Sequence, residues 1–178
     1  MPILEDTDDA FVLKEEPLVD VEDEFGPSFF ILLRNFGFNS ATLKAEHRNI
    51  LQDRVAPFIK NRVGFAEIYA MTDRSGSRQV NYEMAASRLR EVQGALLSVA
   101  APLEKVHHAF AKSLGEDFFE ARHETAGDVF EDGRRDGSFR SVMIALTPAP
   151  IGLPTKIFRT RFVANAVAFG RLHFQRPR

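Results

Sequence analysis

The sequence contains no cysteine, which excludes a disulfide framework, a thiol nucleophile and a thiolate metal site. Its first residues, Met1 to Glu5, include no basic segment, and no apolar segment follows them, so we predict no signal peptide. No run of apolar residues approaches the ~18 that a membrane-spanning helix needs. We therefore expect a soluble chain that encodes no export signal and no transmembrane segment.

The length and composition indicate a single folded domain. With 178 residues, 44% of them hydrophobic, the chain can bury one core but is too short for two comfortable ones. Charge is divided between the two ends: residues 1–25 are rich in Asp and Glu, and residues 148–178 carry Lys and Arg but no acid. Such ends are more often solvated than used for binding, although they could attract each other within or between molecules.

Three regions follow from this distribution. Residues 1–26 are dense in acid, and we predict that they are disordered or loosely draped over the protein. The folded domain is expected at residues 27–147. Residues 148–178 form a Pro-rich linker and a basic C-terminal extension, whose apolar residues need cover from a hairpin, a protein partner or a second copy of the chain.

The hydrophobic pattern predicts strands that alternate with helices. Apolar runs predict strands at residues 29–33, 63–71, 118–123 and 139–146. Helical spacing predicts helices at residues 41–61, 80–100 and 102–114, of which the second carries Ala85, Leu89, Val92, Leu96 and Val99 on one narrow seam. The fold class is thus α+β, with a mixed sheet and helices packed on one of its faces.

The stretch Met71 to Ser77 and the helix after it carry the clearest functional signal. Asp73 ends a strand in a tight polar turn, and Arg88 lies on the following helix, two helical turns after Asn81 and on the same side. A carboxylate and a guanidinium held close together can receive a zwitterion such as an amino-acid head group. The alternative is structural, since Asp73 and Arg88 could form an ion pair or cap the turn.

Four motifs in this order resemble a known family. They are Phe36 to Leu43 (FGFNSATL), Thr72 to Ser77 (TDRSGS), Asn81 to Arg88 (NYEMAASR) and Phe139 to Val142 (FRSV). Together they resemble the strand-to-helix signature, the Thr-Asp-x-x-Gly turn, the helix start and the closing strand of the OmpA-like peptidoglycan-binding domain. That family includes outer-membrane porin tails, peptidoglycan-associated lipoproteins and flagellar stator proteins, and the resemblance covers roughly residues 28–147.

The resemblance implies a βαβαββ-type module that binds bacterial cell-wall peptidoglycan through the diaminopimelate of its stem peptide, without covalent chemistry. By position, Asp73 would hold the ligand ammonium and Arg88 its carboxylate. Hydrogen bonds would complete the pocket, and Arg140 would lie near its rim; the remaining residues implied are Asn39, Thr72, Val80 (through its backbone) and Asn81. Such a protein would be an anchor facing the cell envelope.

Some positions depart from the family pattern. Ala70 and Met71 replace the usual pair before Thr-Asp, and Ser141 stands where a second arginine is expected. The absence of an export signal also supports an alternative, in which the scaffold has lost its ligand and serves as a structural component of an injection-type or phage-like particle assembled in the cytoplasm.

Other functions are weakly supported by the sequence. The five histidines lack the spacing of metal ligands, so we predict no metal site. No phosphate-binding glycine loop, nucleophile elbow or catalytic dyad is recognisable. We therefore predict a binding protein rather than an enzyme, with no cofactor and no nucleic-acid partner.

Overall fold

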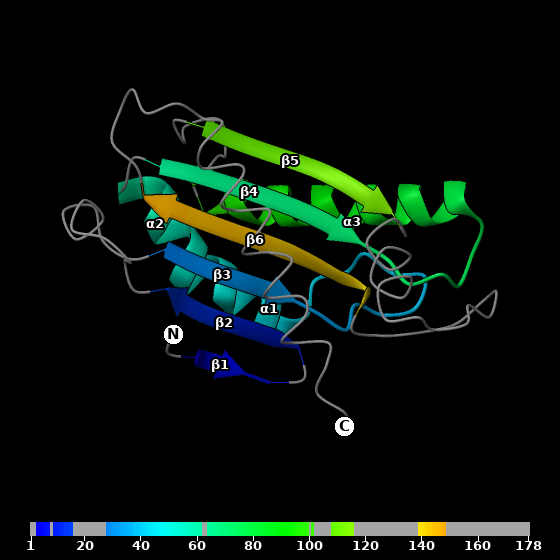
Figure 1. Ribbon diagram of the computed structural model, residues 1–178, viewed down its shortest axis with the longest axis horizontal. Helices are drawn as coiled ribbons and strands as arrows, with labels where there is room; N and C mark the ends of the chain where they lie inside the picture. The colour runs from blue at the N-terminus through cyan, green and yellow to red at the C-terminus, as the bar shows by residue number, and fades with distance from the viewer. Residues whose placement is uncertain are drawn as a thin grey trace.

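The computed structural model describes residues 3–7, 9–15, 28–61, 64–99, 101, 108–115 and 139–148. Its strands form one six-stranded sheet in the order β1-β2-β3-β6-β4-β5 (Figure 1). All neighbouring strands are antiparallel except β4 and β5, which run parallel. The bounds of the strands are β1 Ile3–Asp6, β2 Ala10–Glu15, β3 Ser28–Leu33, β4 Gly64–Met71, β5 His108–Gly115 and β6 Ser141–Pro148.

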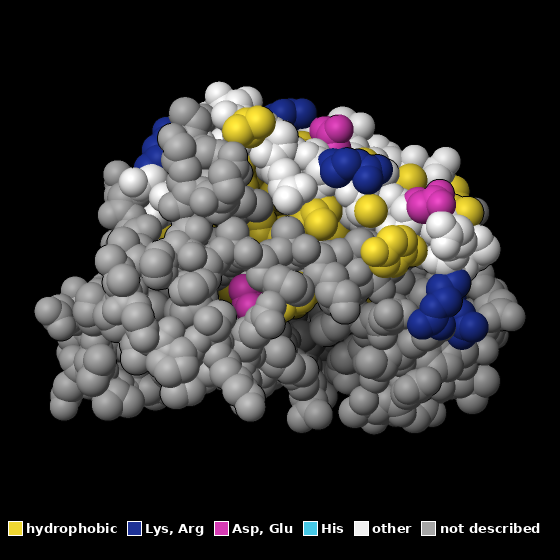
Figure 2. Space-filling model, turned by 90° about the horizontal axis from the view of Figure 1, so that it is seen from above, with side chains coloured by type: hydrophobic (Ala, Val, Ile, Leu, Met, Phe, Trp, Pro, Cys, Tyr) yellow, Lys and Arg dark blue, Asp and Glu magenta, His cyan; other side chains and the backbone are white. Residues whose placement is uncertain are grey.

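The helices lie together on one face of this sheet (Figure 1). A continuous helical segment connects β3 to β4 and consists of α1 (Ala45–Ile50), the π-helical turn η1 (Leu51–Val55) and α2 (Ala56–Asn61). Helix α3 (Arg78–Ser98) connects β4 to β5. On the described part of the surface in Figure 2, basic, acidic and apolar side chains lie among one another rather than in separate patches.

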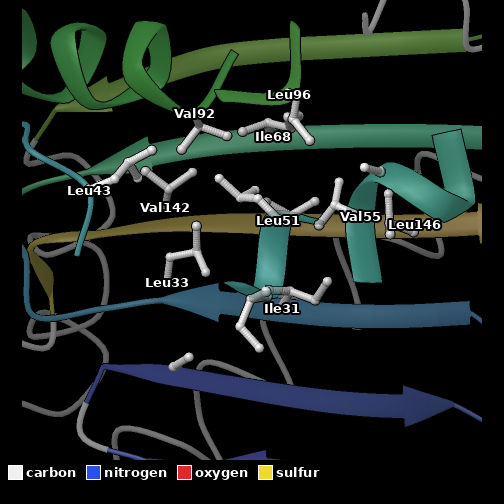
Figure 3. Close-up of a cluster of buried hydrophobic side chains, with 14 of the residues drawn as sticks. Ile31, Leu33, Leu43, Leu51, Val55, Ile68, Val92, Leu96, Val142 and Leu146 are labelled. Carbon is white, nitrogen blue, oxygen red and sulfur yellow. The ribbon is translucent and has the colours of Figure 1, made fainter. Parts of the chain in front are cut away.

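The main core lies between the sheet and the helices (Figure 3). Alternate residues of β3 and β6, such as Ile31 and Ile144, are fully buried against η1 and α3 in this cluster. The predicted seam of α3 is confirmed: Ala85, Val92 and Leu96 are buried, while Leu89 and Val99 pack against the cluster from its margin. Burying each Leu- or Val-sized side chain contributes roughly 1.5–3 kcal/mol, so this cluster is the main support of the fold.

The direction of the strands brings distant loops to one edge of the sheet. Both β3 and β4 run antiparallel to β6, which lies between them, so β3 and β4 point the same way. Their carboxyl ends, Leu33 and Met71, therefore lie beside Val142 and Ser141, the first residues of β6. In open α/β sheets ligands bind outside the carboxyl ends of the strands, and β3 and β4 both end here.

From β3 onward the described elements follow the order β, α, β, α, β and β that the family resemblance implied, and the α+β class is confirmed. Strands β3, β4 and β6 lie within two residues of their predicted bounds. The first helix begins at Ala45 rather than residue 41, because Lys44 precedes it in an extended conformation with φ −72° and ψ 164°. Helix α3 begins two residues early, where the hydroxyl of Ser77 accepts a hydrogen bond from the backbone N–H of Val80.

The prediction of a disordered or draped segment over residues 1–26 was wrong for its first part. Residues 3–6 and 10–15 form a strand pair, and β2 pairs with β3 from Ala10 opposite Leu33 to Glu15 opposite Ser28. Ala10 and Val12 are fully buried in the core. This acidic segment is thus attached to the sheet by backbone pairing with β3, and it buries two small apolar residues at strand spacing.

The helix predicted over residues 102–114 was also wrong at its C-terminal half. His108–Gly115 is instead strand β5, paired in parallel with β4. A short apolar pattern is compatible with either structure, and the hydrogen bonds offered by the edge of β4 favour the strand. The strand predicted at residues 118–123, the charged loop at 127–137 and the extension beyond Pro148 lie outside the described residues.

Candidate functional site

One pocket opens at the edge of the sheet where β3 and β4 end and β6 begins. Its volume is about 90 Å³. All seven residues that the sequence predicted for the site line this pocket. The complete lining is Phe38, Asn39, Thr72, Asp73, Ser75, Gly76, Val80, Asn81, Met84, Arg88 and Arg140.

Asp73 is the acidic group of the pocket. It follows the end of β4, and its side chain is only 2% exposed. One carboxylate oxygen, Oδ2, accepts a hydrogen bond from Nη1 of Arg140 at 2.8 Å, and the other, Oδ1, accepts one from the hydroxyl of Ser75 at 2.7 Å. The negative charge of Asp73 is therefore stabilised inside the protein by an opposite charge and a neutral donor.

Arg88 is the buried cation of the pocket, with 1% of its surface exposed. Its guanidinium donates to three backbone carbonyl oxygens: those of Ser40 and Met71, both at 3.1 Å, and that of Gly37 at 3.4 Å. The group also lies 5.4 Å from the ring centre of Phe36. A guanidinium has five N–H donors, so these bonds leave one N–H on each terminal nitrogen for a carboxylate.

The burial of Arg88 lowers its pKa and increases the stabilisation that a bound anion would give its charge. Burial lowers the pKa of Arg88 to about 10, the charge of Asp73 raises it, and the charge of Arg140 lowers it. The guanidinium still carries its charge at neutral pH. Among the described residues its direct hydrogen-bond acceptors are carbonyl groups, so an incoming carboxylate would give this buried cation a full counter-charge.

Arg140 is more deeply involved in the site than the sequence indicated. We predicted a position near the rim, with a sheet-edge charge as the simpler interpretation. Besides its bond to Asp73, Arg140 donates from Nε to the carbonyl of Phe36 at 2.8 Å, and its own carbonyl accepts the N–H of Phe36 at 3.0 Å. Arg140 thus fixes the turn after β3 and the turn after β4 at the same time.

The remaining predicted residues form the walls. Thr72 is 2% exposed, and its hydroxyl oxygen has no hydrogen-bond partner among the described residues. Asn81 is buried at the start of α3 and donates from its side chain to the carbonyl of Gly76 at 3.2 Å. Asn39 is exposed in the turn after β3 with φ 49°. The N–H of Val80 is used within the protein, because it donates to the Ser77 hydroxyl at 3.3 Å.

Sequence reasoning missed Phe38, Ser75, Gly76 and Met84, which also line the pocket. Met84 could have been found, because Asn81, Met84 and Arg88 are three and four residues apart and share one side of α3. Ser75 lies two residues after Asp73 in the turn, a spacing at which side-chain hydrogen bonds are common. The role of Phe38 depends on the turn after β3, which no local pattern specifies.

The described residues offer neither a metal centre nor a membrane-spanning helix. Within them, no group of three or more His, Asp or Glu side chains is placed to hold a metal ion. Likewise, no helix in the described part of the chain combines the length and the apolar character needed to cross a membrane.

Comparison with known proteins gives matches among solved structures. No family model matches the sequence, and no curated protein matches it. A solved structure of the OmpA-like domain of FopA1 from Francisella tularensis is 17% identical, with a TM-score of 0.46 over 81% of this chain and 86% of that chain. The chain is similar to OmpA-like domains.

Two further structures belong with this comparison. The peptidoglycan-associated lipoprotein of Burkholderia pseudomallei is 20% identical, with a TM-score of 0.48 over 64% of this chain and 88% of that chain. The cell wall anchor of the type VI secretion system of Pseudomonas aeruginosa is 17% identical, with a TM-score of 0.47 over 78% of this chain and 88% of that chain.

Proposed function

We propose that this protein binds peptidoglycan without covalent chemistry, through the diaminopimelate of the stem peptide, and so anchors an envelope or particle component to the cell wall. The observation that carries the proposal is the placement of Asp73 and Arg88 around one small pocket. The pocket provides both charges that an amino-acid head group requires. A protein with this role acts by binding alone, so the proposal requires no residue around the pocket to catalyse a reaction.

The size and chemistry of the pocket suit the free end of diaminopimelate, which has an ammonium and a carboxylate on one carbon atom. The volume of about 90 Å³ is several times the ~10–15 Å³ that one water molecule needs, so such a head group can enter. Arg88 would receive the carboxylate through the N–H groups that its carbonyl partners leave, and Asp73 would receive the ammonium. The hydroxyl of Thr72 is available to complete the hydrogen bonds of the ligand.

The expected affinity for a single site is modest. Hydrogen bonds to charged groups contribute roughly 1.5–3 kcal/mol each, and association costs several kcal/mol, which gives a Kd of about micromolar or weaker. Many repeats of the same stem peptide on a polymeric wall would raise the effective affinity. Weak single-site binding is therefore compatible with anchoring.

The alternative is a ligand-free scaffold that takes part in a larger assembly. It is consistent with the ion pair between Asp73 and Arg140 and with the three carbonyl bonds of Arg88, since each gives a charged group a partner inside the protein. A ligand-free scaffold does not account for the buried hydroxyl of Thr72, which has no hydrogen-bond partner among the described residues. We favour binding, because the same pocket holds a buried cation bonded to neutral carbonyl groups and a hydroxyl without a partner among the described residues.

Co-sedimentation with purified diaminopimelate-type sacculi tests the proposal. We expect the full chain to pellet with the sacculi and Asp73→Ala and Arg88→Ala to stay in the supernatant. Arg90→Ala is the matched control, because Arg90 lies on the same helix but is exposed. Far-UV circular dichroism checks that each variant is folded. Equal pelleting of all four proteins, or no pelleting of the unaltered chain, would contradict the proposal.

A further inference from the structure

The two charges that would receive a zwitterion are not equally available. Asp73 already has a cationic partner in Arg140 and a hydroxyl donor in Ser75. Arg88, by contrast, is bonded to neutral carbonyl groups among the described residues, although it is 1% exposed. A carboxylate entering the pocket gives Arg88 its first anionic hydrogen-bond partner there, whereas an ammonium must share Asp73 with Arg140.

Among the described residues, the lining of the pocket carries a net positive charge. Within the described lining, Arg88 and Arg140 contribute two positive charges and Asp73 one negative charge, and the other described lining residues have no side chain that is ionised at neutral pH. The balance is one positive charge in a small, largely buried volume. A ligand group with negative charge is therefore favoured over a neutral or positive group, and the low local polarity strengthens this preference.

We propose that the pocket selects its ligand by a free carboxylate at Arg88, and that the ammonium is a secondary determinant whose contribution Arg140 limits. This inference rests on the proposed function and makes it more specific: stem peptides whose diaminopimelate carboxylate is free are bound, and those in which it is amidated are rejected. Arg140 is a specificity-determining residue that acts through Asp73.

Four small ligands of similar length distinguish the contribution of the carboxylate to binding from that of the ammonium. They are meso-diaminopimelate, pimelate (both carboxylates, no amine), the diamide of diaminopimelate (both amines, no charged carboxylate) and cadaverine (both amines, no carboxylate). NMR titration of the full chain, which measures millimolar as well as micromolar Kd values, compares them directly. Loss of charge-assisted hydrogen bonds of roughly 1.5–3 kcal/mol corresponds to roughly a 10- to 100-fold change in Kd.

We expect pimelate to bind within roughly 10-fold of diaminopimelate, and the diamide and cadaverine to bind at least roughly 10-fold more weakly than pimelate. If the diamide or cadaverine binds as tightly as pimelate while the protein still pellets with sacculi, the inference is wrong and the proposed function stands. If the unaltered protein neither pellets with sacculi nor binds diaminopimelate, the proposed function itself fails.

The role of Arg140 has a separate test. Arg140→Gln removes the cation that competes for Asp73, so the advantage of diaminopimelate over pimelate should increase by roughly 10-fold. Arg140→Lys keeps the charge and should keep the order found for the unaltered chain, and Arg90→Gln controls for the loss of a positive charge elsewhere. An unchanged ratio in a folded Arg140→Gln variant, judged by its amide NMR spectrum, would show that Arg140 does not set the selectivity.

Discussion

Arg140 and Asp73 form an ion pair of 2.8 Å between residues 67 positions apart in the chain. The side chain of Arg140 is 18% exposed and that of Asp73 is 2% exposed, so the pair is largely shielded from solvent. The same arginine holds the carbonyl of Phe36. The pair therefore stabilises the fold at the edge of the sheet as well as the charge of the pocket.

Removing one partner of this pair should destabilise the protein. In Arg140→Ala the carboxylate of Asp73 loses its cation and the Phe36 carbonyl loses a donor, so we expect the free energy of unfolding to fall by about 2–4 kcal/mol. Urea denaturation measures this. Lys44→Ala is the control, because Lys44 pairs with Asp9 at a more exposed position and should lose less than about 1 kcal/mol. Equal losses in the two variants would contradict the buried role of the Arg140 pair.

His47 should make the stability of the fold depend on pH. It is fully buried, its Nε2 lies 3.1 Å from the Asp9 carbonyl and 3.0 Å from the Arg34 carbonyl, and its Nδ1 accepts the N–H of Lys44 at 3.3 Å. These contacts fit a neutral ring with its proton on Nε2. Burial lowers the pKa of His47 below 6.5, in spite of the two carbonyls and the charge of Asp9, which raise it, while Lys44 lowers it further.

The lowered pKa of His47 determines the direction in which stability changes with pH. Because the unfolded chain binds a proton at higher pH than the folded chain, the contribution of His47 is complete above its ordinary pKa of 6.5 and is lost as the pH falls toward its lowered folded value. We expect the urea midpoint to decrease between pH 7.5 and about pH 5, and a His47→Gln variant to lose part of that decrease. An identical pH dependence in both proteins would exclude His47 as its source.

The acidic N-terminal segment should contribute to stability through β2. Val12 is fully buried in the core, so Val12→Ala leaves a cavity and should cost about 1–3 kcal/mol in the free energy of unfolding. The exposed residue Gln52 on η1 provides a comparison, since Gln52→Ala should change stability by no more than about 0.5 kcal/mol. A Val12→Ala variant as stable as the unaltered chain would mean that residues 10–15 do not pack as described.

Two glycines near or on α3 should respond differently to alanine. A Cβ at Gly94 meets nothing within 4 Å, so Gly94→Ala should stabilise the helix by about 0.5–1 kcal/mol and leave sacculus binding unchanged. A Cβ at Gly76 would lie 3.1 Å from Oδ1 of Asn81, in the wall of the pocket. Gly76→Ala should therefore weaken binding to sacculi in the same sedimentation assay. Equal pelleting of Gly76→Ala and Gly94→Ala would contradict this placement of Asn81.

The elements that could be predicted are those with a strong local pattern. Strand β3 is an apolar run, β4 is mostly apolar, and α3 has a seam that includes Ala85, Val92 and Leu96. The site residues on the turn after β4 and on α3 were accessible for the same reason, because a strand end and the next helix fix their relative positions. Five of the seven predicted residues lie on that short segment, whereas Asn39 and Arg140 lie outside it and were implied by the family resemblance.

What the sequence could not provide depends on contacts between distant segments. Strand β2 pairs with β3 and buries Ala10 and Val12, although its segment has an acidic composition that suggests disorder. Strand β5 depends on the free edge of β4 rather than on its own pattern. The bond between Arg140 and Asp73 requires β6 to lie between β3 and β4, a strand order that no local motif encodes.

The insertion of β6 between β3 and β4 has a consequence for biosynthesis. Arg140 contacts Phe36 across 104 positions and Asp73 across 67, so the pocket is incomplete until the ribosome has released the closing strand and that strand has entered the middle of the sheet. Contacts of such long range form slowly, because the chain must first close a large loop. A nascent chain that ends before residue 139 is therefore expected to lack the assembled pocket, so the ligand binding proposed above would require completed folding.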